Sequence, residues 1–145
     1  MRIFFDTNVL VAASAEAHPH HASAFPAVER VAVGHDKGFI SSHSLAEAYA
    51  ALTRLPVLPR IHPTEAYRII TETLLPHFEV VELEKDDYLI ALNMVRDGGW
   101  YGAKIYDALL LRCAGKCRAH RIYTFNLADF VALASSELRD KICLP

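Results

Sequence analysis

Short apolar runs alternate with helical patterns along the whole chain. Four runs have the length and the β-branched or aromatic content of buried strands: residues 3–5, 39–41, 78–83 and 121–125. Residues 142–144 are a candidate edge strand. Between the runs, apolar residues recur at three- and four-residue intervals, which predicts helices over residues 9–15, 22–33, 45–54, 64–75, 86–95, 105–114 and 130–138. Strands that alternate with helices predict an α/β fold with a mostly parallel sheet of four to five strands.

The same intervals indicate which side of each helix faces the core. The expected inward residues are Phe25, Val28 and Val31 in one helix, Leu45, Ala48, Tyr49 and Leu52 in the next, and Leu89, Leu92 and Val95 in a third. The helix over residues 105–114 is apolar nearly all round, so it is expected to be mostly buried. Proline-rich residues 55–63 and glycine-rich residues 97–102 are expected to be loops.

Length and composition are those of one domain with a full core. The chain has 145 residues, of which 52% are apolar, and we expect a single domain over residues 1–145. No apolar stretch is long enough to span a membrane, and Asp6 interrupts the first apolar run before a signal peptide can form. Three cysteines without a disulfide spacing favour a reducing compartment, so a cytoplasmic protein is expected.

Two clusters of metal-binding residue types have simpler explanations. His18, His20 and His21 suit the polar start of a helix, and no cysteine accompanies them. Cys113, Cys117 and His120 lack the fourth ligand of a structural zinc site, so buried thiols are the favoured interpretation. The net charge of −2 does not indicate a nucleic-acid-binding protein, although residues 96–121 carry six basic and two acidic side chains. That local positive charge is compatible with phosphate binding or with a solvent-exposed helix face.

Four acidic residues occupy comparable places beside the predicted strands: Asp6, Glu47, Asp107 and Asp129. Each one alone is explained as a helix-capping residue, and Ser44 with Glu47 fits a capping box. Because parallel strands deliver their carboxyl ends to one edge of a sheet, the four acids are instead expected to meet there. A cluster of like charges in a low dielectric needs cations, and oxygen ligands select Mg²⁺ or Mn²⁺.

Four short motifs in order resemble those of the PIN domain family. They are Asp6-Thr7-Asn8, Ser44-Leu45-Ala46-Glu47, Ile105-Tyr106-Asp107-Ala108 and Thr124-Phe125-Asn126 with Asp129-Phe130. The resemblance spans essentially the whole chain and, at this length, extends to the VapC toxins of toxin–antitoxin pairs. It implies a three-layer α/β/α fold and a Mg²⁺-dependent endoribonuclease that hydrolyses RNA with a metal-activated water. It also implies a VapB-type antitoxin as partner and a homodimer, within a heterotetramer or larger complex when the antitoxin is bound.

The resemblance assigns roles to particular residues. Asp6 and Asp107 would bind the metal directly, and Glu47 and Asp129 would complete its shell. Supporting residues would be Thr7, Asn8, Thr124 and Asn126, with the two threonines orienting water. Many family members have an acid where this chain has Asn126, so Asp129 is expected to take that role. RNA contacts are expected from Arg54, Trp100, Lys104 and Arg112, with Tyr101 and Tyr106 as further stacking candidates.

Three alternatives to this prediction remain open. A phosphohydrolase with an aspartyl nucleophile is disfavoured because Asn8 stands where the general acid would be. The same domain without catalysis would bind RNA or a protein partner. A metal-dependent DNA nuclease would use the same acids. The sequence does not indicate which RNA is cleaved.

Overall fold

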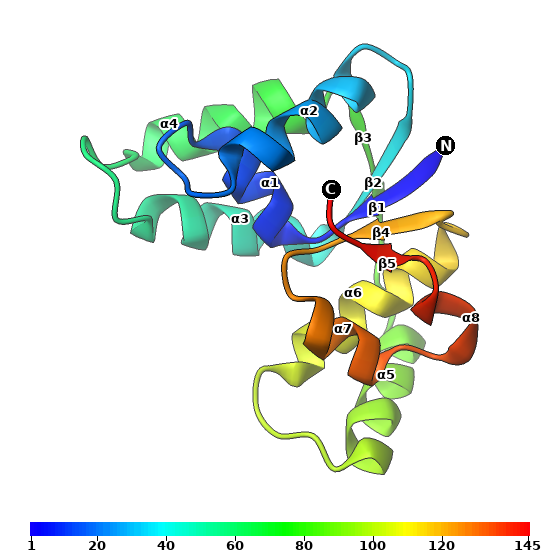
Figure 1. Cartoon of the computed structure of the whole chain (residues 1–145). Helices are drawn as coiled ribbons and strands as arrows, with labels where there is room; N and C mark the ends of the chain where they lie inside the picture. Colours follow the sequence, from blue (N-terminus) through cyan, green and yellow to red (C-terminus); the bar gives the residue numbers. More distant parts are fainter.

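A five-stranded, wholly parallel sheet forms the centre of the computed structural model, which describes residues 1–145 (Figure 1). The strands lie in the order β3 (Phe78–Val81), β2 (Lys37–Ser41), β1 (Arg2–Phe5), β4 (Arg121–Tyr123) and β5 (Ile142–Cys143). Every neighbouring pair is parallel. The α/β prediction is confirmed, and the candidate edge strand is the fifth strand of the sheet.

Helices cover both faces of this sheet in three layers (Figure 1). One face carries α1 (Thr7–Ser14), α2 (His21–Ala32), α3 (Ser42–Arg54), α4 (Pro63–Arg68) and the π-helix η1 (Ile69–Leu74). The other carries α5 (Lys85–Gly98), α6 (Lys104–Lys116), α7 (Leu127–Leu133) and α8 (Ser136–Arg139). None of these helices has both the length and the apolar character that crossing a bilayer requires.

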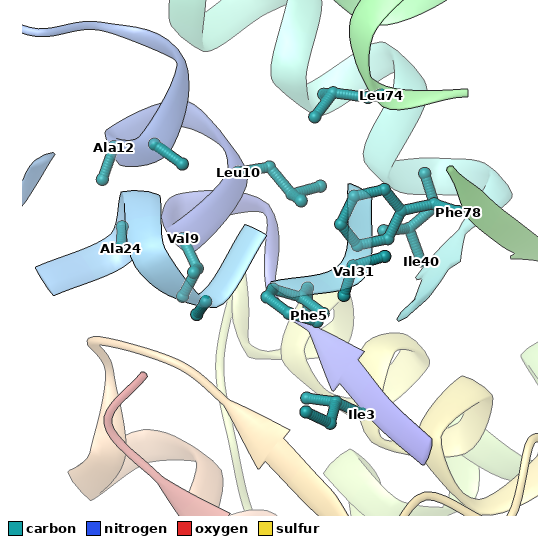
Figure 2. Close-up of a cluster of buried hydrophobic side chains, with 12 residues drawn as sticks. Ile3, Phe5, Val9, Leu10, Ala12, Ala24, Val31, Ile40, Leu74 and Phe78 are labelled. Carbon is teal, nitrogen blue, oxygen red and sulfur yellow. The ribbon is translucent and has the colours of Figure 1, made fainter. Parts of the chain in front are cut away.

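Successive side chains of the central strand β1 point to opposite faces of the sheet and contribute to a hydrophobic core on each face. Ile3 and Phe5 pack into the cluster formed with α1 and α2, and Phe4 packs into the cluster formed with α6 and α7. Figure 2 shows Phe5 and Phe78 in the first cluster, with their ring centroids 5.1 Å apart in an edge-on arrangement. Burial on both faces explains why the first apolar run of the sequence is the centre of the sheet.

Two predicted helices are interrupted in the structure. The helix expected over residues 64–75 is α-helical only to Arg68 and then continues as the π-helix η1. The helix expected over residues 130–138 is divided into α7 and α8, because Ala134 and Ser135 have extended backbones. Ala134 is also buried in the core, so the chain turns there to keep this residue packed. Apolar spacing detects neither interruption.

Several predicted inward residues are exposed. In α2 the buried residues are Ala24, Ala27 and Val31, whereas Phe25 is 45% exposed. Tyr49 of α3 is also exposed, and α5 leaves Leu89 and Leu92 about half exposed. These predictions were wrong for a physical reason: periodicity indicates which residues share a helix face, and only the tertiary structure decides whether another element covers that face. Of the residues expected to face inward on these three helices, Val31, Ala48 and Leu52 are buried, and Val28, Leu45 and Val95 are partly buried against the core. The expected burial of the helix over residues 105–114 is confirmed for most of its residues.

The chain changes direction across the sheet between β1 and β4. From β1 it proceeds through β2 to β3 on one side, and it then crosses back so that β4 lies against the other side of β1. In a parallel sheet this switch point opens a crevice beyond the carboxyl ends of the two strands. Asp6 directly follows β1 and Thr124 directly follows β4, so both begin at this crevice.

Candidate active site

Asp6 extends the pairing of β1 and β4 by one residue into the crevice. Its backbone N–H donates to the Tyr123 carbonyl (2.9 Å), and its carboxylate accepts a 2.6 Å hydrogen bond from the Thr124 hydroxyl. Asp6 occupies the N-cap position of α1, but its side chain forms no capping hydrogen bond. The Asp6 carboxylate, 5% exposed, is therefore held against the neighbouring strand at the crevice.

The environment of Asp6 disfavours its charge. Burial, the largest effect, raises the pKa of Asp6 from 3.8 to about 6, and the negative charges of Asp107 and Glu47 act in the same direction. The hydrogen bond from Thr124 acts against this rise in pKa. Asp6 has no salt-bridge partner in the structure. A cation beside this carboxylate would remove the cost of keeping it ionised.

Glu47 lies on α3 and is held by a residue of α1. The Thr7 hydroxyl donates to Oε2 of Glu47 at 2.8 Å and lies 3.0 Å from the hydroxyl of Ser44. The predicted capping box of Ser44 and Glu47 is not formed, because α3 begins earlier and Ser41 is its N-cap, accepting from the His43 N–H. Glu47 is therefore free of a capping role, and Thr7 connects it to the segment that carries Asp6.

Asp107 is in the first turn of α6 and is half-buried. Burial is the largest cause that raises its pKa to about 6, and the charges of Asp129 and Glu47 raise it further. The Lys104 ammonium opposes these effects and lowers the pKa of Asp107. Asp6 precedes α1, Glu47 lies in α3 and Asp107 lies in α6, and each of these three acids interacts electrostatically with the other two.

Asp129 differs from Asp6 and Asp107 because it already forms a salt bridge, whereas Glu47 has the His43 ring 3.6 Å from its carboxylate. Its carboxylate forms a salt bridge with Lys104 and accepts a 2.8 Å hydrogen bond from the Asn126 amide. These two contacts, with Lys104 first, hold the pKa of Asp129 below its usual range. The structure therefore places Asp129 beside the acid cluster, neutralised by Lys104, instead of at its centre.

The acids line two adjoining clefts that share Glu47 and Asp107. The larger, about 580 Å³, contains Asp6, Glu47 and Asp107 together with the cleft residues Thr7, Asn8, Val11, His18, His20, Ala50, Ala51, Arg54, Leu110 and Phe125. The smaller, about 380 Å³, contains Glu47, Asp107 and Asp129 with Tyr101, Ala103, Lys104, Tyr106 and Asn126. The predicted convergence of the four acids at one edge of the sheet is thus present, spread along a crevice.

This donor set fits a hard divalent cation. All the acidic groups supply oxygen atoms, and two of them are partly or fully desolvated without a cation of their own. No three side chains of the His, Cys, Asp and Glu types converge tightly enough to ligate one ion simultaneously. An ion here would keep several water ligands, which is the usual state of Mg²⁺ in proteins.

The expected supporting residues Asn8, Thr124 and Asn126 form hydrogen bonds with one another's segments at the ends of β1 and β4. Besides the contact of Thr124 with Asp6, the Asn126 N–H donates to the Thr124 hydroxyl at 2.9 Å. Asn8 accepts from the Phe125 N–H at 3.2 Å, and its amide nitrogen lies 3.5 Å from the Thr124 hydroxyl. The side chains of Asn8 and Thr124 therefore connect the segment after β4 to the first turn of α1.

The expected RNA-contacting residues are divided between two places. Arg54 lines the larger cleft, and Lys104 lines the smaller one with its ammonium 5.7 Å from the Trp100 ring centroid. Arg112 instead forms a 2.8 Å salt bridge with Asp87 of α5. It follows Asp107 by five residues, a rotation of about 140° around the helix, so it faces away from the acids. The structure thus argues against a substrate contact by Arg112.

His18, His20 and Phe125 also line the larger cleft, although their positions in the sequence do not predict this. The histidines were explained as a helix start, and no sequence signal indicates that the turn before α2 folds back onto the crevice. The interpretation of the cysteines holds, since Cys113 and Cys117 are buried and burial raises the pKa of Cys117 to about 11. His120 accepts a hydrogen bond from the Arg2 N–H.

Fold and site together define an α/β domain with a carboxylate-lined crevice at the switch point of a parallel sheet. The sequence pattern of the PIN domain matches residues 3–134, and the chain belongs to this family. A comparison with curated protein sequences finds no significant match.

Two solved structures, one of VapC20 and one of VapBC2, have similar folds. One is Mycobacterium tuberculosis VapC20, described as a sarcin–ricin loop cleaving toxin, with 22% sequence identity and a TM-score of 0.70 over 93% of this chain and 97% of that chain. The other is VapBC2 from Rickettsia felis, bound to a DNA fragment from its promoter, with 20% identity and a TM-score of 0.60 over 88% of this chain and 90% of that chain. The predicted three-layer PIN-like fold is confirmed by these similarities.

Proposed function

We propose that this protein is a VapC-type toxin, a Mg²⁺-dependent endoribonuclease that hydrolyses phosphodiester bonds in RNA. The observation that carries this proposal is the arrangement of Asp6, Glu47 and Asp107, which come from the end of β1, from α3 and from α6 and line one cleft at the switch point of the sheet. Membership of the PIN domain family and the fold shared with a toxin that cleaves the sarcin–ricin loop support it.

The metal would be held chiefly by Asp6 and Asp107, with Glu47 directly or through water. Asp129 would complete the set through water, because Lys104 and Asn126 already contact its carboxylate. A divalent ion at such a site, Mg²⁺ or in its place Mn²⁺, acidifies a water and stabilises negative charge on phosphate oxygens. The hydrogen bonds described above would hold the metal-binding carboxylates in place. Thr124 orients Asp6, and Thr7 orients Glu47.

Substrate binding would use the cationic and aromatic groups beside the acids. Arg54 in the larger cleft and Lys104 in the smaller one would contact phosphates on the two sides of the cleaved bond. Trp100, 38% exposed and next to Lys104, would stack on an unpaired base. These contacts bring the phosphate backbone over Asp107 and Glu47, which both clefts share.

The central test is cleavage of single-stranded RNA with Mg²⁺ by D6N and D107N. We expect losses of at least about 100-fold in rate, because each change removes an anionic oxygen from the metal site. The matched control is D86N, an exposed acid on α5 outside both clefts, which should keep wild-type activity. Activity retained by D6N or D107N would contradict the mechanism.

Assays with DNA and RNA in parallel separate this proposal from its alternatives. Preferential cleavage of RNA by the wild-type protein is the expected result. Preferential cleavage of DNA would indicate a DNA nuclease that uses the same acids. Tight RNA binding without cleavage in Mg²⁺ or Mn²⁺ would indicate a catalytically inactive binding domain.

A VapB-type antitoxin and a second copy of the chain are the proposed partners, in the cytoplasm. The name of the Rickettsia felis complex, VapBC2, supports an antitoxin as partner. A small open reading frame beside the gene should encode a protein that co-purifies with this chain and suppresses its cleavage of RNA. Light scattering of the isolated chain should give twice the mass of 16.2 kDa, and a monomer at micromolar concentration would exclude the homodimer.

A further inference from the structure

A pair of stacked rings lines the cleft beside the acids. His20, from the turn before α2, and Phe125, from the segment after β4, have ring centroids 4.4 Å apart and ring planes inclined by 17°. The His18 ring lies next to them, 5.8 Å from that of His20. All three residues line the same cleft as Asp6, Glu47 and Asp107. We call His20 and Phe125 the aromatic platform.

One ring of the platform is half-buried and the other is exposed. Phe125 is half-buried against the core cluster of α1 and α2, and its backbone N–H is held by Asn8. The His20 side chain is exposed. Its backbone is held in place, because the His20 N–H donates to Nδ1 of His18 at 3.1 Å. Because His20 is exposed and lines the cleft, its ring contributes little to the core and is available to a ligand.

Arg54 supplies the cleft with an unpaired cation. It is exposed at the end of α3, lines the cleft with the platform, and forms no salt bridge with any carboxylate of the chain. A guanidinium without a carboxylate partner is well suited to a phosphate, which it can bind through two donors. The cleft thus combines carboxylates, a stacking surface and a phosphate-binding group.

We propose that the aromatic platform and Arg54 form a subsite for the nucleotide next to the scissile phosphate, with the base stacked on His20 and its phosphate bound by Arg54. This inference rests on the proposed ribonuclease function and adds the position of one nucleotide. A base can stack on His20 only when it is unstacked and unpaired, so the subsite selects single-stranded segments or loops over duplex RNA. Stacking tolerates every base, so the platform selects for strandedness rather than for sequence.

The first experiment measures steady-state cleavage of a single-stranded oligoribonucleotide by H20A and H20W. We expect H20A to raise KM about tenfold, within the range measured for loss of one base–aromatic stack, and to change kcat little. H20W keeps a stacking surface and should restore KM. The control H77A removes an exposed histidine just before β3, at the opposite edge of the sheet, and should have no effect. Thermal unfolding checks that all variants are folded.

The second experiment measures binding without catalysis, using a fluorescent single-stranded oligonucleotide with 2′-O-methyl groups. H20A should weaken binding about tenfold without changing its salt dependence, because a stack releases no counterions. R54A should reduce the slope of log Kd against log salt by about 0.7, the value for one phosphate contact in a single strand. A duplex of the same sequence should bind H20A and the wild-type protein equally.

These results distinguish the subsite from the function on which it rests. If the wild-type protein cleaves RNA and H20A matches it in both KM and Kd, the subsite is overturned and the ribonuclease stands. If the wild-type protein cleaves no RNA but H20A still weakens binding, the ribonuclease is overturned and the nucleotide subsite stands. An equal loss of binding to single strand and duplex in H20A would also overturn the subsite.

Discussion

The carboxylate of Asp6 shows how burial and function are connected at one residue. It sits 5% exposed between Thr124 and the crevice, and the resulting rise of its pKa to about 6 means that its ionised form destabilises the metal-free protein. A neutral side chain at position 6 would make the metal-free protein more stable than an ionised carboxylate does. We therefore expect activity and metal-free stability to respond in opposite directions when Asp6 is changed.

Replacement of Asp6 by Asn should stabilise the metal-free protein above pH 6. The folded state holds the Asp6 proton up to a pKa of about 6 and the unfolded state only to 3.8, so wild-type stability falls as the pH rises through this window. The neutral amide avoids that loss, and we expect D6N to gain about 2 kcal/mol at about pH 8 in chelator. Urea denaturation at about pH 8 and pH 4 measures it. Lower stability of D6N than wild type at pH 8 would contradict the explanation.

Stabilisation by Mg²⁺ should depend on pH with a definite sign. Protons compete with the ion for Asp6 and Asp107, whose pKa values are both about 6. Millimolar Mg²⁺ should therefore raise Tm clearly near pH 8 and little at pH 5, measured by differential scanning fluorimetry with NaCl at equal ionic strength as control. An increase in Tm that is the same at both pH values would argue against these two carboxylates as ligands.

At the scale of elements, one carboxylate joins α5 to α6. Asp87 accepts the Glu84 backbone N–H at the start of α5 and forms salt bridges with Arg112 (2.8 Å) and Lys116 (2.5 Å) of α6. Burial by itself would raise the pKa of Asp87, but the contacts with Glu84, Lys116 and Arg112 outweigh it and lower the pKa to about 2. The basic residues of α6 that suggested a phosphate-binding surface are thus partly used for packing one helix against another.

D87N should destabilise the protein at neutral pH by about 2 kcal/mol, because the depressed pKa stabilises the folded state by roughly that amount. This contribution is complete above the unfolded pKa of 3.8 and disappears as the pH falls towards 2. Urea denaturation should show the full difference at about pH 7 and about half of it at about pH 3. The adjacent exposed Asp86 provides the control, and equal effects of D86N and D87N would contradict the role of the salt bridges.

A close contact between β2 and β3 requires glycine at position 38. A Cβ atom at Gly38 would lie 2.6 Å from the Phe78 ring and 2.7 Å from Val31. We expect G38A to cost about 1–3 kcal/mol through overpacking, measured by thermal or urea unfolding. At Gly115 in α6 an added Cβ meets only Leu138, at 4.0 Å. G115A should instead stabilise by about 0.5–1 kcal/mol, and destabilisation by both changes to the same extent would refute the packing argument.

At the scale of the whole molecule, the order of the strands decides which acids meet. Asp6 and Thr124 are 118 positions apart and hydrogen-bond because β4 pairs directly with β1. Alternation of strands and helices predicted a parallel sheet but not this order. The prediction that the acids share one edge needed only the parallel direction, and therefore it held, whereas the pairing of Asp129 with Lys104 depends on the packing of α6 beside α7.

Errors in the expected core also arise at this scale. Leu89 and Leu92 repeat at the spacing of a buried face, yet α5 lies on the outside of the α5–α6 pair and exposes both. His18 and His20 resemble an ordinary helix start, yet the return of the chain before α2 places them in the cleft. Local sequence patterns do not indicate which element packs against a given helix face or turn.

By itself, the sequence determined most of the elements, the α/β class and the four motifs of the PIN domain family, because apolar spacing and the order of motifs can be read along the chain. It did not determine the π-helix η1 or the break between α7 and α8. Only the tertiary structure decided that the Asp6 and Glu47 side chains serve no helix cap, that Arg112 turns to Asp87, and that His20 stacks on Phe125. Hydrogen bonds and burial depend on which distant residues become neighbours, and this follows from strand order and helix packing together.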